Sequence, residues 1–232
     1  MPPTPADPRR RVLLYGGSFD PPHLGHVMAA TWALALERFD EVRLVPAFGH
    51  PFGKRLTPFL LRCNMVAAAV AHLGPRVRVE AIEGELPAPS YTIDTVNALS
   101  AREPGVAWTL MMGADAWADR RKWKAWDALE AKVSTLVVGR AGAPDPDGVV
   151  AETKLPDVSS TEVRRRAAAS VAFDRLVPAA VTDLIRAHGL YSGRAAASAG
   201  AELAPAAASG ARSAARYGVL GRGRAARSLV PV

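Results

Sequence analysis

Residues 12–26 have the sequence Val12-Leu13-Leu14-Tyr15-Gly16-Gly17-Ser18-Phe19-Asp20-Pro21-Pro22-His23-Leu24-Gly25-His26. The apolar run at 12–15 predicts a buried β-strand, and the glycine pair that follows ends it and lets the backbone approach a ligand. His23 and His26 are three residues apart at the start of a predicted helix, so they fall on one side of it. The first amides of a helix lack acceptors and carry a partial positive charge. The segment therefore predicts a strand–loop–helix unit with an anion site in its loop.

The same alternation continues along the chain, where short apolar runs alternate with helical patterns from residue 11 to about residue 192. Further strands are predicted at 42–45, 77–81, 107–112 and 133–138, with a last short apolar run at 151–155. Helices are predicted at 24–39, 58–73, 90–101 and 178–187. Another is predicted to follow the hydroxyl residues at 159–161, which are typical of a helix N-cap. Such alternation predicts a Rossmann-like three-layer α/β/α sandwich with a mainly parallel sheet.

Composition limits the class of protein. The 232 residues are enough for one well-buried domain plus extensions. Hydrophobic residues make up 49% and charged residues 22%, which excludes wholesale disorder and a fibrous fold. The single cysteine, Cys63, excludes a disulfide framework and a cysteine-rich zinc site, and we expect it to be a small buried hydrophobe. Because no apolar run approaches the roughly 18 residues of a membrane span, and residues 1–11 lack the apolar stretch of a signal peptide, we expect a cytoplasmic protein without a membrane partner.

The formal charge of +7 is concentrated at one end of the chain. From Arg194 onward six arginines accompany one acidic residue, Glu202, so this tail carries +5 and the remainder only +2. We expect an N-terminal arm at 1–10, a catalytic domain at 11–192, and a disordered Ala/Gly/Arg-rich tail at 193–232. A solvated appendage is the simpler interpretation of the tail. The alternative is weak contact with RNA or an anionic surface. Arginines scattered singly among alanines argue against it, because they do not form a strong basic footprint.

The histidine loop suits a polyphosphate better than a metal ion. No third ligand lies close in sequence, and paired histidines of a helical zinc site are usually four residues apart. The chain also lacks the Gly-x-x-x-x-Gly-Lys-Ser/Thr loop of Walker-type NTPases and the Gly-x-Gly-x-x-Gly fingerprint of dinucleotide oxidoreductases. Gly25 between the two histidines is expected to keep space open.

Two segments resemble the signature motifs of the nucleotidylyltransferase superfamily. The run His23-Leu24-Gly25-His26 resembles its HxGH motif, and Val158-Ser159-Ser160-Thr161-Glu162-Val163-Arg164 resembles its ISSTxIR motif. Within that superfamily the chain resembles the bacterial nicotinate-nucleotide adenylyltransferases. Three further segments carry this likeness, which spans about residues 11–191: Pro89-Ser90-Tyr91-Thr92 followed by Thr95, Gly113-Ala114-Asp115 followed by Trp123, and Gly189-Leu190-Tyr191.

The resemblance implies a nucleotidylyltransferase-type fold and a reaction of NAD biosynthesis. The phosphate of nicotinate mononucleotide attacks the α-phosphorus of ATP, and pyrophosphate leaves. No protein nucleophile is needed, so catalysis consists of positioning and charge neutralisation. Mg²⁺ is expected to travel with the ATP phosphates, without a dedicated protein metal site. A homo-oligomer is left open.

The resemblance also implies residue roles. His23, His26, Lys54 and Arg164 would be catalytic. The ATP site would comprise Gly16, Gly17, Ser18, Phe19, His23, His26, Gly113, Asp115, Ser159, Ser160, Thr161 and Arg164. The mononucleotide site would comprise Ser18, Lys54, Tyr91, Thr92, Trp123 and Lys124. Trp123 would stack on the cationic pyridine ring, with ordinary packing in a tryptophan cluster as its alternative, and a helix N-cap is the alternative for Asp115.

One stretch departs from the family pattern. Where these enzymes often carry Pro-Pro-His-Lys, this chain has Phe48-Gly49-His50-Pro51-Phe52-Gly53-Lys54-Arg55. Lys54 would take the phosphate-binding role, and the altered loop leaves nicotinamide mononucleotide open as the acceptor. Phosphopantetheine adenylyl transfer is a more distant alternative. A regulatory nucleotide-binding protein is another, against which the intact motifs argue.

Overall fold

The computed structural model describes residues 9–49, 55–145 and 151–192. Their strands form one sheet, in the order β3-β2-β1-β4-β5-β6. The strands are β1 (Arg10–Gly17), β2 (Glu41–Pro46), β3 (Val77–Val79), β4 (Val106–Gly113), β5 (Ser134–Arg140) and β6 (Thr153–Leu155). Every neighbouring pair is parallel, which confirms the predicted parallel sheet.

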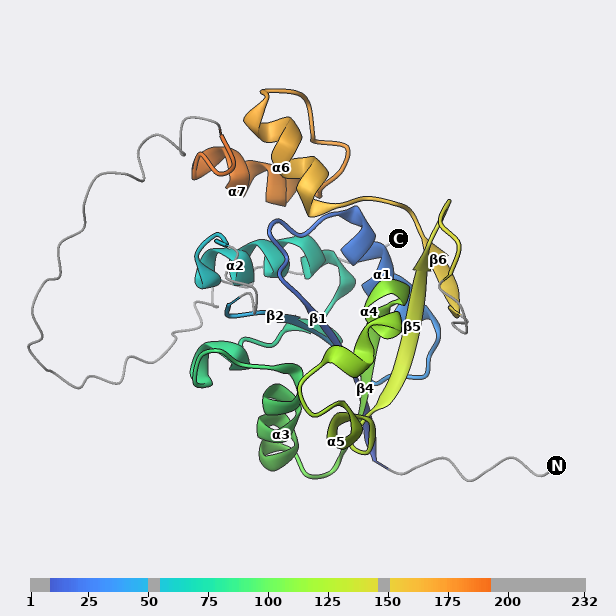
Figure 1. Ribbon diagram of the computed structural model, residues 1–232. Helices are drawn as coiled ribbons and strands as arrows, with labels where there is room; N and C mark the ends of the chain where they lie inside the picture. The colour runs from blue at the N-terminus through green and yellow to red at the C-terminus, as the bar shows by residue number, and fades with distance from the viewer. Residues whose placement is uncertain (1–8, 50–54, 146–150, 193–232) are drawn as a thin grey trace, which may run out of the picture. The chain divides into compact units, whose positions relative to one another are not determined.

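Helices cover both faces of this sheet (Figure 1). On one face lie α1 (Leu24–Ala35), α2 (Phe59–Val70), α6 (Ser160–Ala168) and α7 (Ala179–Ala187), and on the other lie α3 (Thr92–Arg102) and α5 (Trp126–Glu130). Strand β1 divides its side chains between the two layers, because Leu13 packs in the first core while Val12 and Leu14 pack in the second. The three-layer sandwich predicted from the alternation is therefore confirmed.

The long helices were predicted from the sequence, but the short ones were not. The helix predicted at 24–39 ends at Ala35, and the predicted helix at 58–73 divides into α2 and a 3₁₀ helix at Ala71–Leu73. Helix α4 (Ala114–Ala118), helix α5 and the 3₁₀ helices Ile82–Glu85 and Arg120–Lys122 were not predicted, because one turn is too short to show a helical period. Cys63 is buried in α2 as expected.

The strand order places several loops at one edge. The chain moves outward from β1 to β3 on one side, then returns to β4 beside β1 and continues outward to β6. Neighbouring loops at such a switch point form the usual ligand crevice of an open parallel sheet. None of the helices in the described ranges is long and apolar enough to cross a membrane. The predicted tail at 193–232, His50 and Lys54 lie outside these ranges.

Candidate active site

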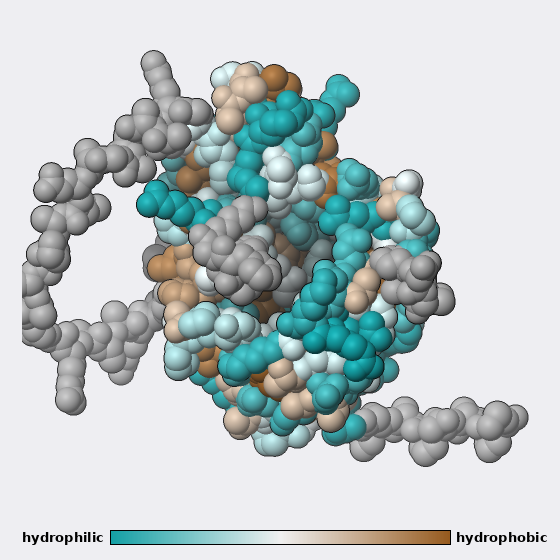
Figure 2. Space-filling model, in the orientation of Figure 1, coloured by the Kyte–Doolittle hydropathy of each residue, from teal (hydrophilic) through white to brown (hydrophobic). Residues whose placement is uncertain are grey.

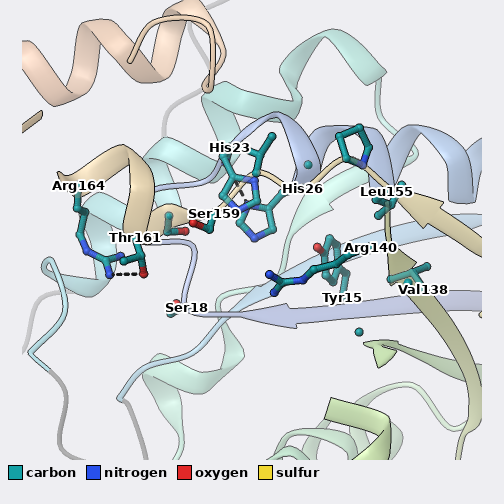
Figure 3. Close-up of a pocket in the computed structure, with 16 residues that line it drawn as sticks. Tyr15, Ser18, His23, His26, Val138, Arg140, Leu155, Ser159, Thr161 and Arg164 are labelled. Carbon is teal, nitrogen blue, oxygen red and sulfur yellow. Dashed lines mark hydrogen bonds between the residues drawn. The ribbon is translucent and has the colours of Figure 1, made fainter. Parts of the chain in front are cut away.

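A cavity of about 310 Å³ lies at the carboxyl edge of the sheet. Figure 2 shows a hollow below α6 on this face, with hydrophilic residues along its rim. Eight residues that the motifs predicted line the cavity: Ser18, His23, His26, Gly113, Ser159, Ser160, Thr161 and Arg164. They come from the loops after β1, β4 and β6, so the fold brings both signature motifs to one space (Figure 3).

The two histidines form a stacked pair. Their ring centroids are 3.7 Å apart and the planes meet at 26°. The Nδ1 atom of His26 accepts the backbone N–H of His23 at 3.0 Å. A neutral imidazole that accepts at Nδ1 carries its proton on Nε2, so His26 keeps an N–H donor for a ligand. A Cβ added at Gly25 would lie 3.1 Å from two atoms of the His23 ring, which explains the glycine between the histidines.

The buried ring of Phe19 packs against the histidine pair. Phe19 has a left-handed backbone with φ of 47°, and its ring lies in the core with an edge contact to His26 at 4.8 Å between centroids. A Cβ at Gly17 would lie 3.2 Å from that ring. The absence of a side chain at Gly17 therefore allows the Phe19 ring to pack directly against the backbone of β1. Phe19 can therefore reach a ligand only through its backbone.

The surroundings keep both imidazoles uncharged in the free protein. Burial, followed by the nearby positive charge of Arg140, lowers the pKa of His23 to about 4. Burial, the His23 ring and Arg140 together lower the pKa of His26 well below its ordinary value. At neutral pH the pair therefore offers uncharged N–H donors to the cavity and no positive charge.

Helix α6 forms the opposite wall. The Ser159 hydroxyl accepts the Glu162 amide at 3.2 Å and caps the helix, as the hydroxyl run predicted. The Ser160 hydroxyl donates to the Pro21 carbonyl at 2.9 Å, which joins the second motif to the loop just before the first. Arg164 donates to the Asp20 carbonyl at 2.6 Å and to the Thr161 hydroxyl at 3.1 Å (Figure 3). Its guanidinium is thereby held at one end of the cavity.

Arg140 was missed by the sequence analysis. It ends β5 and its guanidinium extends into the cavity beneath His26 (Figure 3). Its Nε lies 4.0 Å from Asp115 and its Nη1 lies 3.4 Å from Asp157. The signal that could have found it is its position at the carboxyl end of a predicted strand, where ligand-binding groups of parallel sheets gather. Tyr15, at the end of β1, lines the same cavity.

Gly113 and Asp115, two predicted ATP residues, lie where β4 passes into α4. Gly113 is the N-cap of α4, so the N-cap alternative for Asp115 is wrong. The Asp115 side chain is 81% exposed and lies beside Arg140 at the rim.

Four of the predicted acceptor residues, Tyr91, Thr92, Trp123 and Lys124, lie on the α3 side of the sheet. Ser18 lines the large cavity instead, and Lys54 lies outside the described residues. The ammonium group of Lys124 stands 4.5 Å from the centroid of the Tyr91 ring and bonds to Asp94 at 3.2 Å. Thr92 and Gly16 line a second, narrow cavity of about 20 Å³. Trp123 packs edge-to-face on buried Trp126, with centroids 6.2 Å apart, and stays half-buried.

A family model described as cytidylyltransferase-like matches residues 14–166. A relative from Anaeromyxobacter sp. (strain K) named "Probable nicotinate-nucleotide adenylyltransferase" is 42% identical over 187 residues, covering 79% of this chain and 98% of the relative. One of the same name from Myxococcus xanthus is 40% identical over 184 residues, covering 79% and 96%.

Solved structures share the fold. Plasmodium falciparum nicotinic acid mononucleotide adenylyltransferase complexed with NaAD matches with a TM-score of 0.67 at 18% identity, over 78% of this chain and 97% of that chain. A putative nicotinate-nucleotide adenylyltransferase from Vibrio parahaemolyticus matches with a TM-score of 0.60 at 20% identity, over 78% and 95%.

Proposed function

The chain belongs to the nicotinate-nucleotide adenylyltransferase family, and from that premise we propose that it transfers the adenylyl group of ATP to nicotinate mononucleotide. A phosphate oxygen of the mononucleotide bonds to the α-phosphorus of ATP. The bond from that phosphorus to the oxygen between the α- and β-phosphates breaks, and this oxygen leaves with the pyrophosphate. The products are nicotinate adenine dinucleotide and pyrophosphate, in NAD biosynthesis. The observation that carries the proposal is one cavity that contains the stacked histidines, the α6 N-terminus, Arg140 and Arg164.

This set of groups suits phosphoryl chemistry without a protein nucleophile. His26 offers its Nε2–H to the α-phosphate, where it would stabilise the charge that develops during transfer. The first amides of α6 and the fork of Arg164 bind the β- and γ-phosphates, which leave as pyrophosphate. Arg140 adds a second cation from the other side of the cavity. Positioning and charge neutralisation are what this reaction requires of the protein.

Magnesium fits this scheme as a companion of ATP. In the described residues no group of three or more His, Cys, Asp or Glu side chains could hold a metal ion, and the Asp20 carboxylate in the loop accepts bonds from Tyr191 and Thr57. The oxygen donors that Mg²⁺ prefers would come mainly from the triphosphate. When bound there, Mg²⁺ would neutralise negative charge on the phosphates.

The acceptor is assigned to the α3 side of the sheet. Trp123 and Tyr91 offer ring faces to the pyridinium, and Lys124 and Thr92 offer donors to its carboxylate. Nicotinamide mononucleotide has a similar shape, and discrimination depends on whether donors or acceptors face the carboxylate position. Lys124 is a donor only, which favours the acid. We propose a cytoplasmic location for the enzyme, as expected from the sequence.

Pyrophosphate release tests the proposal. The protein is incubated with ATP and Mg²⁺, and kcat/KM is compared for nicotinate and nicotinamide mononucleotides in parallel. We expect a strong preference for the acid. Preference for the amide would contradict the assigned acceptor, and no release with either would contradict adenylyl transfer altogether.

A further inference from the structure

Arg62 is a buried cation beneath the site loops. It belongs to α2 and is only 1% exposed. Its Nη1 donates to the Ser18 carbonyl at 2.7 Å, its Nε to the Thr57 carbonyl at 2.8 Å and its Nη2 to the Phe48 carbonyl at 3.3 Å. Every hydrogen bond that this guanidinium makes within the described ranges therefore ends on a backbone carbonyl.

Arg43 shows how unusual this environment is. It is also fully buried, in β2, but its guanidinium bonds directly to the carboxylates of Glu41, Glu80 and Glu103. Burying a charge without a direct counter-ion is costly. Arg62 is buried in this way although it has no direct counter-ion among the described residues. Its hydrogen bonds hold the loop after β1 at Ser18 and the loop after β2 at Phe48 and Thr57. A role in loop geometry explains the cost, and a role in the core alone does not.

Glu83 binds the same loop from the opposite side. This carboxylate is 9% exposed. Its Oε2 accepts the Phe48 amide at 2.9 Å and the Ser90 hydroxyl at 3.1 Å. Its Oε1 accepts the Thr95 hydroxyl at 3.1 Å. Ser90 and Thr95 flank the start of α3, so Glu83 joins the β2 loop to the segment that holds Tyr91 and Thr92.

The Phe48 backbone is thus bonded on both sides, its carbonyl by Arg62 and its amide by Glu83. We propose that Arg62 and Glu83 form a clasp on Phe48 that positions the acceptor half of the site, by aligning Ser18, Phe48 and the N-terminus of α3 for the mononucleotide. Neither side chain lines the large cavity, and Glu83 reaches only the narrow cavity of about 20 Å³ beside Thr92, so we class both as positioning residues. The inference rests on the proposed function, since it assigns the aligned segments to the acceptor.

The clasp acts on one substrate more than the other. The ATP wall is built from His23, His26, Arg140 and the first turn of α6, and Arg62 and Glu83 form no hydrogen bond with these groups in the described residues. Ser18, which Arg62 holds, belongs to both predicted sites, whereas Phe48, Ser90 and Thr95 lie next to the acceptor residues only. Loosening the clasp therefore displaces more groups on the mononucleotide side than on the ATP side. The expected kinetic result is a rise in KM for nicotinate mononucleotide that is larger than any rise in KM for ATP.

Two disruptive variants test this in the full-length enzyme. We expect Arg62→Met and Glu83→Leu each to raise KM for nicotinate mononucleotide at least tenfold, while KM for ATP changes less than threefold. In the same variants the Phe48 amide should exchange with solvent at least tenfold faster by NMR. In Glu83→Leu this amide loses its hydrogen-bond acceptor, and in Arg62→Met the Phe48 carbonyl loses the guanidinium that holds the same residue in place. Glu83 gives a second route should Arg62→Met not fold.

Conservative and matched variants separate positioning from stability. Glu83→Gln can accept the Phe48 and Ser90 donors with its amide oxygen and donate to Thr95, whose hydroxyl can turn to the Tyr91 carbonyl 3.4 Å away. We expect this variant to keep both KM values within threefold of wild type. Arg43→Met removes a buried arginine that, among the described residues, bonds only to Glu41, Glu80 and Glu103 and to no loop residue held by the clasp, and should lower stability with both KM values unchanged.

Several results would overturn the clasp. They are an unchanged mononucleotide KM in both disruptive variants, an equal rise of both KM values, reproduction of the effect by Arg43→Met, or a Phe48 amide that stays protected in Glu83→Leu. A wild-type enzyme that releases no pyrophosphate would instead overturn the proposed function, and Phe48 exchange would still report on the clasp itself.

Discussion

Acidification should destabilise the free protein through its buried histidines. The His23 side chain is 8% exposed, and its pKa falls from an ordinary value of 6.5 to about 4 in the fold. Between these two values the unfolded chain binds a proton that the folded protein excludes. Stability from this group is therefore complete above pH 6.5 and is lost as the pH falls toward 4.

The magnitude follows from the pKa difference. One pKa unit corresponds to about 1.4 kcal/mol, and pH 5 lies about 1.5 units below the ordinary histidine value. His23 alone should therefore cost about 2 kcal/mol of unfolding free energy between pH 7 and pH 5. His26, whose pKa is also lowered by burial, adds to the loss in the same direction.

Urea unfolding followed by tryptophan fluorescence measures this loss at pH 7, 6 and 5. In His23→Asn the loss should be smaller than in wild type by about 2 kcal/mol, since the titrating ring is gone. His72→Asn removes an exposed imidazole and is the matched control, expected to keep the wild-type loss. If wild type and His23→Asn lost the same free energy, the argument from a buried neutral pair would be refuted.

Three further predictions concern catalysis. His26→Ala should lower kcat on the order of a hundredfold or more, by loss of a transition-state donor, with a melting temperature near wild type; near-normal turnover would contradict its assigned role. Arg140→Ala should raise KM for ATP roughly tenfold or more, as expected for a charge-assisted bond, whereas Arg102→Ala, which breaks a surface pair with Glu85, should not. Deleting residues 193–232 should leave kcat/KM unchanged in the pyrophosphate assay, and a large loss would show that the tail takes part in turnover.

The predictable part of the site is the part that is local in sequence. The strand at 12–15, its glycine pair and the two histidines fall within one short segment, so periodicity and spacing were enough to place the stacked pair at a helix start. The Ser159 cap was predictable for the same reason, because a cap bonds three residues ahead. Helices α4 and α5 were not, since five residues show no period.

The sequence by itself determined the three-layer class, the parallel strands and the two motifs, because side-chain periodicity and turn chemistry depend on neighbours in the chain. The tertiary structure alone decided which distant groups meet. Tyr191 donates to Asp20 at 2.6 Å across 171 positions of sequence, Arg140 reaches the histidines from β5, and Arg62 and Glu83 meet on one peptide of the β2 loop. Such meetings depend on strand order and on how the layers pack, and no local pattern records either.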